Sequence, residues 1–293
     1  MKFIIWLNPL FIMREINVEK LTKVIRDLAI EASVVANDDL VDALKNAHDN
    51  ESSPVGKAVL GQLIENIDIA KKDKTPICQD TGFTVIYMDV GQDVHFTGGD
   101  VTKAINKGVA QGYVDGYLRK SIVANPITDP KNTGDNTPAI IHTHIVPGDE
   151  VKITLLPKGG GSENMSRLKM MKPADGVEGI KDFVIETVSQ AGGNPCPPTV
   201  IGVGVGGTFD HVAWLAKKAI SRRFGQRNPN PEIAAYETEW LEEINKLGIG
   251  PAGLGGNTTS LELFIEEHPR HIATFPVAVN IQCHAARVKT ATI

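Results

Sequence analysis

The chain of 293 residues has a formal net charge of −5, with 42% hydrophobic and 22% charged residues. This composition is ordinary for a globular protein of one large domain, and the scattered Lys and Arg argue against binding to nucleic acid or to a membrane surface. Three cysteines at wide spacing argue against a secreted disulfide framework and favour a reducing, cytoplasmic compartment.

The first residues resemble the charged start and apolar core of a signal peptide only briefly. Asn8-Pro9 interrupts the apolar run, which falls far short of the ~20 residues of a membrane span, and no small-residue cleavage site follows. We therefore expect residues 1–14 to be an N-terminal extension and residues 15–293 to form the main domain. Met13 is an alternative natural start.

Three amphipathic helices are expected next. Apolar residues recur at helical spacing over 18–32 and again over 40–47, where Asn37-Asp38 gives the start signal. A third helix begins at Ser53-Pro54, with Pro in the first helical position, and Lys71-Lys72 closes it. We expect this all-helical N-terminal segment to pack without contributing chemistry.

A loop that follows the helices concentrates a thiol, an amide and a carboxylate in Cys78, Gln79 and Asp80. Pro76 restricts the backbone before them and Gly82 permits a left-handed turn after them, so we expect a fixed loop. The β-branched and aromatic run at 83–90 then predicts a strand. An isolated cysteine in this position is more often an inert buried thiol.

A helix is expected from Asp100, after the turn at Gly98-Gly99, to about Leu118. Arg119 and Lys120 follow at its C-terminal end. The helix dipole favours cations there, which is enough to explain them structurally.

The middle of the chain combines a predicted hairpin with a glycine-rich stretch. The runs 139–146 and 150–156 predict two strands paired as a β-hairpin. Pro157–Asn164 has the composition of a linker, but it leads into a predicted helix at 164–171, and its bare backbone N–H groups suit an anion cradle equally well. Gly176–Ala191 predicts another helix.

Cys196 lies in the turn Asn194-Pro195-Cys196-Pro197-Pro198. Three prolines leave this cysteine little freedom, which suits a preorganised metal ligand, although a rigid turn that contains a cysteine by chance explains the pattern as well. A strand at 199–205 and a helix at 208–222 follow.

The glycines of this strand and turn match G-x-G-x-x-G and are Gly202, Gly204 and Gly207. We reject a dinucleotide site because the glycines lie inside the strand, and because arginines stand where an acidic residue is expected. A close backbone approach remains, useful for a carboxylate or for tight packing. A helix at 231–247 and strands at 260–266 and 274–282 then lead to Cys283.

The three cysteines are 118 and 87 residues apart, so no local zinc or ferredoxin spacing exists (196 − 78; 283 − 196). Each nevertheless lies at the end of a predicted element, and three converging thiolates would hold three irons of a cubane cluster. The fourth iron would stay open to a substrate carboxylate and hydroxyl as a Lewis acid, which is hydratase chemistry.

Four motifs occur in order: Ile77-Cys78-Gln79-Asp80-Thr81-Gly82, Pro157-Lys158-Gly159-Gly160-Gly161-Ser162-Glu163-Asn164, Pro195-Cys196-Pro197-Pro198 with Gly202-Val203-Gly204-Val205-Gly206-Gly207-Thr208, and Cys283 near the end. With them the sequence resembles the iron–sulfur hydro-lyases, the family of class I fumarate hydratase and L(+)-tartrate dehydratase. The resemblance covers roughly residues 15–293 and implies that this is the hydro-lyase domain.

The resemblance implies a role for each matching residue. Cys78, Cys196 and Cys283 would ligate a [4Fe-4S] cluster whose fourth iron binds a dicarboxylate. Gln79 and Asp80 would touch the substrate, with Asp80 as the acid–base candidate.

The remaining roles concern the rest of the substrate. Arg119 would pair bidentately with a carboxylate, and Gly160 and Gly161 would offer backbone N–H groups. His271 would hydrogen-bond the substrate or tune Asp80, although its pattern alone favours a solvent-facing loop histidine. His142 and His144, on alternate strand positions, are further candidates.

Family enzymes also have a smaller C-terminal domain, for which this chain leaves no room after Cys283. The resemblance therefore implies an alpha subunit with a separate beta subunit, in a dimer of alpha-beta pairs. We expect an α+β fold of mixed sheets flanked by helices, and reversible hydration of fumarate to malate. The alternatives are dehydration of L(+)-tartrate, a non-catalytic cluster-binding module and an NAD-dependent oxidoreductase.

Overall fold

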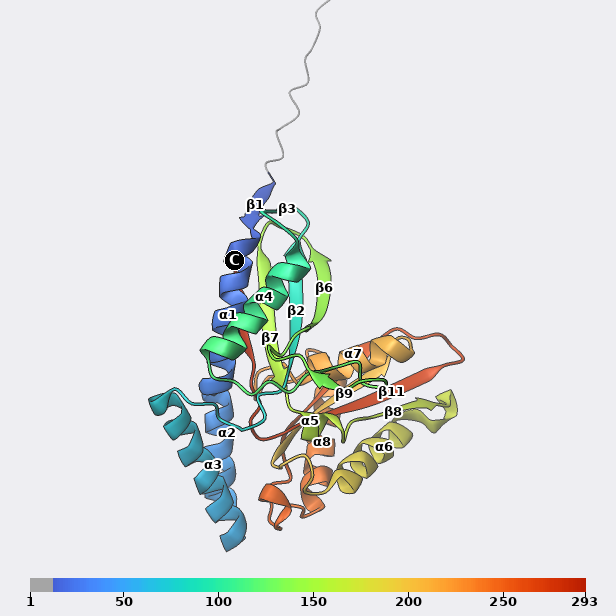
Figure 1. The fold of residues 1–293 in the computed structure, drawn as a ribbon. Coiled ribbons are helices and arrows are strands. Elements are labelled where there is room, and N and C mark those ends of the chain that lie inside the picture. Colours follow the sequence, from blue (N-terminus) through green and yellow to red (C-terminus); the bar gives the residue numbers. More distant parts are fainter. Residues whose placement is uncertain (1–12) are drawn as a thin grey trace, which may run out of the picture.

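The protein is described by a computed structural model over residues 13–293, in which two four-stranded sheets are flanked by helices (Figure 1). This confirms the expected α+β fold. Residues 1–12, and with them most of the expected extension, lie outside the described residues. Strand β1 begins at Arg14, inside the expected extension, and pairs in parallel with β3 (Val94–Thr97).

The three expected N-terminal helices are confirmed as α1 (Val18–Val34), α2 (Asp38–Asn50) and α3 (Pro54–Asp73). The Asn17 side chain accepts the Glu19 N–H at the start of α1, and the Ser53 hydroxyl accepts the Gly56 N–H at the start of α3. Buried apolar residues of α2 and α3 join one cluster with residues of both sheets.

The first sheet forms the upper part of the molecule in Figure 1. Its strands, in order of pairing, are β12 (Lys289–Thr292), β7 (Val151–Lys158), β2 (Phe83–Gly91) and β6 (Ile140–Val146). Helix α1 and helix α4 (Val101–Asp115) pack against each other and share a buried apolar cluster with this sheet. Helix α4 ends earlier than expected, so Arg119 and Lys120 lie in the loop beyond it.

The predicted hairpin of β6 and β7 is wrong. Strand β2 lies between them, parallel to β6 and antiparallel to β7. The reason is burial. Val85, Ile86 and Met88 place apolar side chains on both faces of β2 and are almost fully buried, so the central position in the sheet removes the most apolar surface from water. Strand β6 alternates exposed and half-buried residues and occupies the edge.

The second sheet pairs its strands in the order β10 (Ser260–His268), β9 (Thr199–Gly206), β11 (Phe275–Gln282) and β8 (Arg167–Met171). Helices α6 (Gly176–Ala191) and α8 (Pro231–Lys246) share one apolar cluster with this sheet. Helix α7 (Phe209–Ala219) packs on it through a separate small cluster. The remaining short elements are β4 (Val123–Ala124), β5 (Lys131–Asn132), α5 (Gly160–Glu163) and the 3₁₀ turns Pro173–Asp175 and Pro251–Gly253.

The helix predicted at 164–171 is also wrong. Only the single turn α5 is helical, and Arg167–Met171 instead forms β8, antiparallel to β11. Pairing with the free edge of β11 provides partners for the backbone groups of this segment, which a short isolated helix would not do as stably. Arg167 and Lys169 then lie over the Phe183 ring of α6.

The glycine-rich strand β9 is a packing surface for α7. A Cβ atom on Gly202 would lie 2.1 Å from the Ala216 carbonyl oxygen, and one on Gly204 would lie 2.3 Å from that of Val212. Both glycines are therefore needed for helix–strand contact, which supports rejecting a dinucleotide site.

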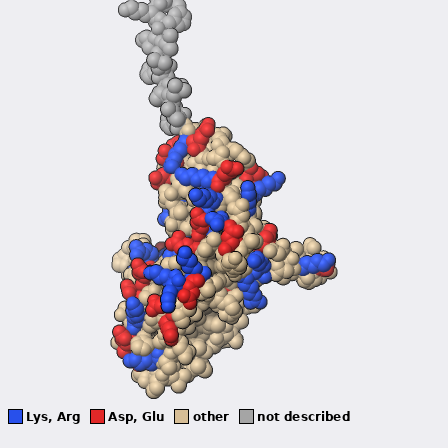
Figure 2. Space-filling model, turned by 60° about the vertical axis from the view of Figure 1, so that its left-hand side comes forward, with Lys and Arg blue, Asp and Glu red and all other residues tan. Residues whose placement is uncertain are grey.

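The described residues contain no membrane-spanning helix, and the face drawn in Figure 2 shows no large patch of charges of one sign. No helix among residues 13–293 is long and apolar enough to cross a membrane. The face in Figure 2 carries basic and acidic side chains intermixed.

Gly202→Ala should lower the free energy of unfolding by about 1–3 kcal/mol, because the added methyl group overlaps the backbone of α7. Gly61→Ala is the matched control: it lies within α3 with no atom closer than 3.8 Å to its new Cβ, and should raise stability by about 0.5–1 kcal/mol. Urea unfolding followed by circular dichroism measures both. Equal effects of the two substitutions would contradict the packing role of Gly202.

Candidate functional site

The candidate site lies where both sheets direct their strand ends and loops. The loop with Cys78 and Asp80 enters β2, and the glycine-rich stretch leaves β7 beside it. Cys196 precedes β9, and Cys283 follows β11. Residues more than two hundred positions apart in the sequence therefore meet at one junction.

The three thiols are close enough to influence one another. Burial raises the pKa of the Cys78 thiol, and the charge of Cys283 raises it further. Burial also raises the pKa of Cys196, followed by the charges of Cys283 and Cys78. The backbone segments of Cys196 and Cys283 are also joined, because the N–H of His284, the residue after Cys283, donates to the Cys196 carbonyl at 3.3 Å.

The cysteines differ in exposure. Cys283 is buried, Cys78 is half-buried, and Cys196 is exposed, with a left-handed φ of 56°. No group of three or more His, Cys, Asp or Glu residues within 13–293 is arranged to hold a single metal ion. That result concerns one shared ion, whereas the thiolates of an iron–sulfur cluster each bind a different iron.

The Asp80 carboxylate is fixed by two backbone donors. Oδ1 accepts the Gly82 N–H at 2.9 Å, and Oδ2 accepts the Gly160 N–H at 2.8 Å. Gly82 has φ 77°, and a Cβ there would lie 2.8 Å from the Lys158 backbone. Glycine at this position therefore lets the loop before β2 approach the end of β7.

The same loop is held from its other side by Tyr113 of α4. The buried Tyr113 hydroxyl lies 2.8 Å from the Thr81 carbonyl and 3.0 Å from the Gly82 carbonyl. The Thr81 hydroxyl in turn donates to the Arg119 carbonyl at 2.9 Å. The backbone of Arg119 is thereby tied to the site while its side chain stays exposed.

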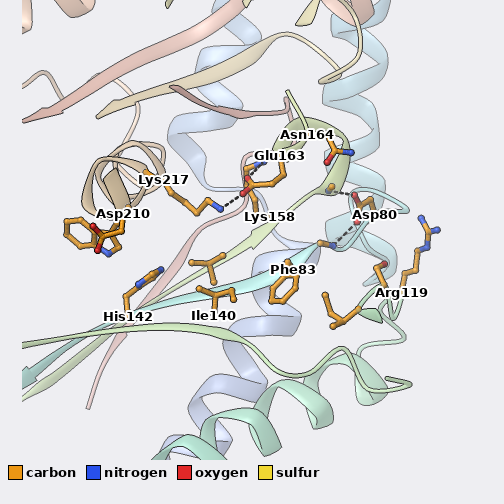
Figure 3. Close-up of a pocket in the computed structure, with 17 residues that line it drawn as sticks. Asp80, Phe83, Arg119, Ile140, His142, Lys158, Glu163, Asn164, Asp210 and Lys217 are labelled. Carbon is orange, nitrogen blue, oxygen red and sulfur yellow. Dashed lines mark hydrogen bonds and ion pairs between the residues drawn. The ribbon is translucent and has the colours of Figure 1, made fainter. Parts of the chain in front are cut away.

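A cavity of about 660 Å³ opens beside Asp80 (Figure 3). Gly160, Arg119 and His142 also line it, and the Trp214 ring of α7 forms part of its wall. His142 and His144 both contact Trp214, with ring centroids 6.5 and 4.8 Å away, so they do face one side of β6. Burial, followed by the charge of Lys217, lowers the pKa of His142.

Sequence reasoning missed an ion-pair cluster in the cavity wall, formed by Lys158, Glu163 and Lys217 (Figure 3). Lys158 Nζ donates to the Ser162 hydroxyl at 2.7 Å and lies 3.4 Å from Glu163 Oε2, while Lys217 pairs with Glu163 Oε1. Burial lowers the pKa of Lys158 to about 8. Burial opposes ionisation of Glu163, but the two lysines outweigh it and lower its pKa.

The signal for this cluster was in the sequence. Lys158 and Glu163 flank the three glycines, but the expectation considered only the backbone N–H groups of that stretch. Lys217 lies on α7, and only the tertiary fold brings it to them.

Two of the site residues predicted from the sequence, Gln79 and His271, do not line the cavity beside Asp80. Gln79 is exposed, and its Oε1 lies 3.4 Å from Cys78 Sγ. His271 lies in the turn between β10 and β11, where its Nδ1 accepts the Ala273 N–H, and lines a separate cavity of about 510 Å³ with His211 and His268. The described chain therefore brings together Asp80, Arg119 and Gly160, but does not bring His271 to their cavity.

Comparison with known proteins places these observations in a family. Residues 22–292 match the family model described as "Fumarate hydratase (Fumerase)". The chain is 44% identical to the "Putative L(+)-tartrate dehydratase subunit alpha" of Methanocaldococcus jannaschii, over 92% of this chain and 95% of that one. It is 35% identical to the "L(+)-tartrate dehydratase subunit alpha" of Escherichia coli strain UTI89, over 92% and 89%.

Tyr113→Phe should lower the free energy of unfolding by about 1–3 kcal/mol, because the Thr81 and Gly82 carbonyls lose a buried donor. Tyr117→Phe is the control, since Tyr117 is 90% exposed. Denaturant unfolding compares the two, and a Tyr113→Phe protein as stable as the control would show that the hydroxyl does not hold the loop.

The stability of the wild type relative to a Lys158→Met variant should depend on pH. Below about pH 8 the ammonium is buried and charged, which penalises the folded state. Above pH 8 the folded state releases this proton while the unfolded lysine retains it up to pH ~10.4, so wild type gains on the variant, by on the order of 3 kcal/mol. Urea unfolding at pH 7, 8, 9 and 10 measures this, and a constant difference would contradict the lowered pKa.

Proposed function

Since the chain belongs to the fumarate hydratase (Fumerase) family and is a hydro-lyase, we propose that it is the alpha subunit of an iron–sulfur enzyme that reversibly hydrates fumarate to (S)-malate. One observation carries the proposal: a backbone-held carboxylate, Asp80, borders a cavity lined by cationic groups and lies beside three mutually interacting thiols. A dianionic substrate matches that cavity, and the thiols match the cluster ligands.

The cysteines fit a [4Fe-4S] cluster by their chemistry. Burial and the charge of Cys283 raise the pKa of the Cys78 and Cys196 thiols, and the nearby charge of Arg287 does not offset this rise at Cys78. Cluster iron would stabilise the thiolates. We propose that Cys78, Cys196 and Cys283 hold it. When bound, the cluster would supply an open iron that acts as a Lewis acid toward the substrate hydroxyl.

The chain's own residues would bind and orient the substrate. The Arg119 guanidinium, at the cavity, suits one substrate carboxylate as a bidentate partner. The Gly161 N–H lies in the first turn of α5, where helices leave donors without intrahelical partners, and can serve the other end together with Gln79.

Asp80 is our candidate for moving the proton. Its two backbone hydrogen bonds hold the carboxylate in one orientation, as a positioned general base requires. Gly160 would act through this contact, because its N–H is already engaged by Asp80. We also propose His271 as a second acid–base group. It lines a separate cavity in this chain, so its contact with the substrate would depend on the partner subunit.

The names of the relatives support a partner. Both are called subunit alpha, and we propose that a beta subunit completes the site in a dimer of alpha-beta pairs. We also propose a cytoplasmic location, because thiols that are to bind iron must stay reduced.

Dehydration of L(+)-tartrate is the second candidate, favoured by the printed names of the two relatives. Tartrate carries one more hydroxyl than malate and needs an additional hydrogen-bond acceptor. Glu163 is the obvious acceptor in the cavity wall, but its oxygens already accept from Lys217 and Asn280 and lie near Lys158. This engagement is why we rank fumarate first.

The chain, co-purified with its beta subunit and reconstituted anaerobically with iron and sulfide, should turn over fumarate, measured as absorbance at 240 nm, and should turn over tartrate poorly. Cys→Ser substitutions at 78, 196 or 283 should abolish turnover together with cluster absorbance. Turnover of tartrate but not of fumarate would make tartrate dehydration the preferred function. A colourless, iron-free protein would contradict the proposed cluster. Stable cluster uptake without turnover would indicate a non-catalytic binding module.

Asp80→Asn should lower kcat by about 10²–10⁴-fold, because proton transfer is lost. Asn keeps only one of the two oxygens that accept the Gly82 and Gly160 N–H groups, but the thiol of Cys78 in the same loop is unchanged, so iron content should stay the same. Asp115→Asn, an exposed carboxylate paired with Arg26, is the control and should leave kcat unaltered. A kcat near wild type for Asp80→Asn would remove Asp80 from the acid–base role.

A further inference from the structure

Arg287 is a buried cation for which the described residues give no counter-ion. It follows Cys283 by four residues, and only 2% of its surface is exposed. Its Nη1 donates to the Asp80 carbonyl at 2.8 Å. Its Nε and Nη2 are buried without a hydrogen-bond partner, and no carboxylate within 13–293 lies within 4.0 Å of its nitrogens.

Such an arrangement is unfavourable in the chain by itself. A buried charge without a partner costs several kcal/mol, and the N–H groups of two unpaired nitrogens add their own desolvation penalty. Arg222 shows the usual solution, because its largely buried guanidinium pairs with the buried carboxylate of Glu237 at 2.6 Å. Arg287 therefore indicates an anion that the chain alone does not supply.

The free Nη2 lies near the glycine-rich stretch and the Asp80 carboxylate. A Cβ on Gly159 would be 3.8 Å from Nη2, and it would also be 3.3 Å from Asp80 Oδ2. Burial raises the pKa of the Cys78 thiol, and the charge of Arg287 opposes that rise, so the two groups are in electrostatic range. Arg287 does not line the 660 Å³ cavity, which argues against a substrate carboxylate as its partner.

We propose that Arg287 is the counter-ion of the iron–sulfur cluster, donating from Nε and Nη2 to its sulfur atoms while Nη1 holds the loop of Asp80. This inference rests on the proposed function. A cluster bound by thiolates is anionic and accepts hydrogen bonds at sulfur, so it satisfies both the charge and the two free donors. Arg287 is then a positioning residue that links cluster binding to the placement of Asp80.

The test uses wild type, Arg287→Met and Arg287→Lys, each reconstituted anaerobically. Iron and sulfide per chain are measured first, followed by the rate of iron loss to a ferrous chelator. Arg287→Met should lose iron about 10–100-fold faster, as substitutions around a metal's ligands typically do. Arg287→Lys, which keeps the charge but not the planar fork, should be intermediate.

Thermal unfolding of the cluster-free chains separates this role from a merely structural one. Arg287→Met should unfold no earlier than wild type, because it removes an uncompensated buried charge. Arg222→Met is the matched control: it removes the nearest cation from the buried Glu237 carboxylate and should lower the unfolding midpoint without changing the iron-loss rate of the folded protein.

The alternative results are distinct. Wild-type iron retention in Arg287→Met, or a lowered midpoint of the cluster-free variant in proportion to its iron loss, would overturn the inference alone. Unchanged iron retention with a raised KM for malate would assign Arg287 to a substrate carboxylate instead. If wild type takes up no iron, the proposed cofactor fails, and this inference fails with it.

Discussion

The site depends on the close approach of the loop before β2 to the end of β7. The register pairs Phe83 with Lys158, so the residues on either side of this pair leave the sheet together. Gly82 makes the approach possible because a side chain there would overlap the Lys158 backbone. The Asp80–Gly160 hydrogen bond and the burial of Lys158 both follow from this single contact.

Several cationic groups lie around this contact. Arg119 and Lys217 line the cavity, Arg287 donates to the Asp80 carbonyl, and the Gly82 and Gly160 N–H groups donate to the Asp80 carboxylate. Glu163 offsets part of this positive charge within the cavity wall. A junction of this kind binds anions by its overall electrostatics, and individual groups then set their orientation. The proposed anionic cofactor and anionic substrate would both be favoured by this electrostatic field.

Local signals predicted most of the helices, whereas they did not show which strands pair. Pro54 and Asp100 mark helix starts by backbone chemistry that neighbouring residues fully determine. The hairpin expectation failed because β2, whose residues precede their partners in β7 by 61 to 75 positions, competes better for β7 (151 − 90; 158 − 83). The segment 167–171 failed for the same reason, since the free edge of β11 lies a hundred residues away. The motifs pointed to the cysteines and Asp80, whose roles stay predictions, whereas only the fold brings Lys217 and Arg287 close to them.

The last strand of the first sheet has a kinetic consequence. Strand β12 pairs with β7 across 134 positions (289 − 155), after the chain has built the whole second sheet in between. The segment with Cys283 and Arg287 spans this gap and is fixed only when both sheets exist. Contacts so distant in sequence form slowly. During refolding, therefore, the helices and the earlier strands would form before the three thiols come together. An oxidant present in that interval would react with the thiols more readily.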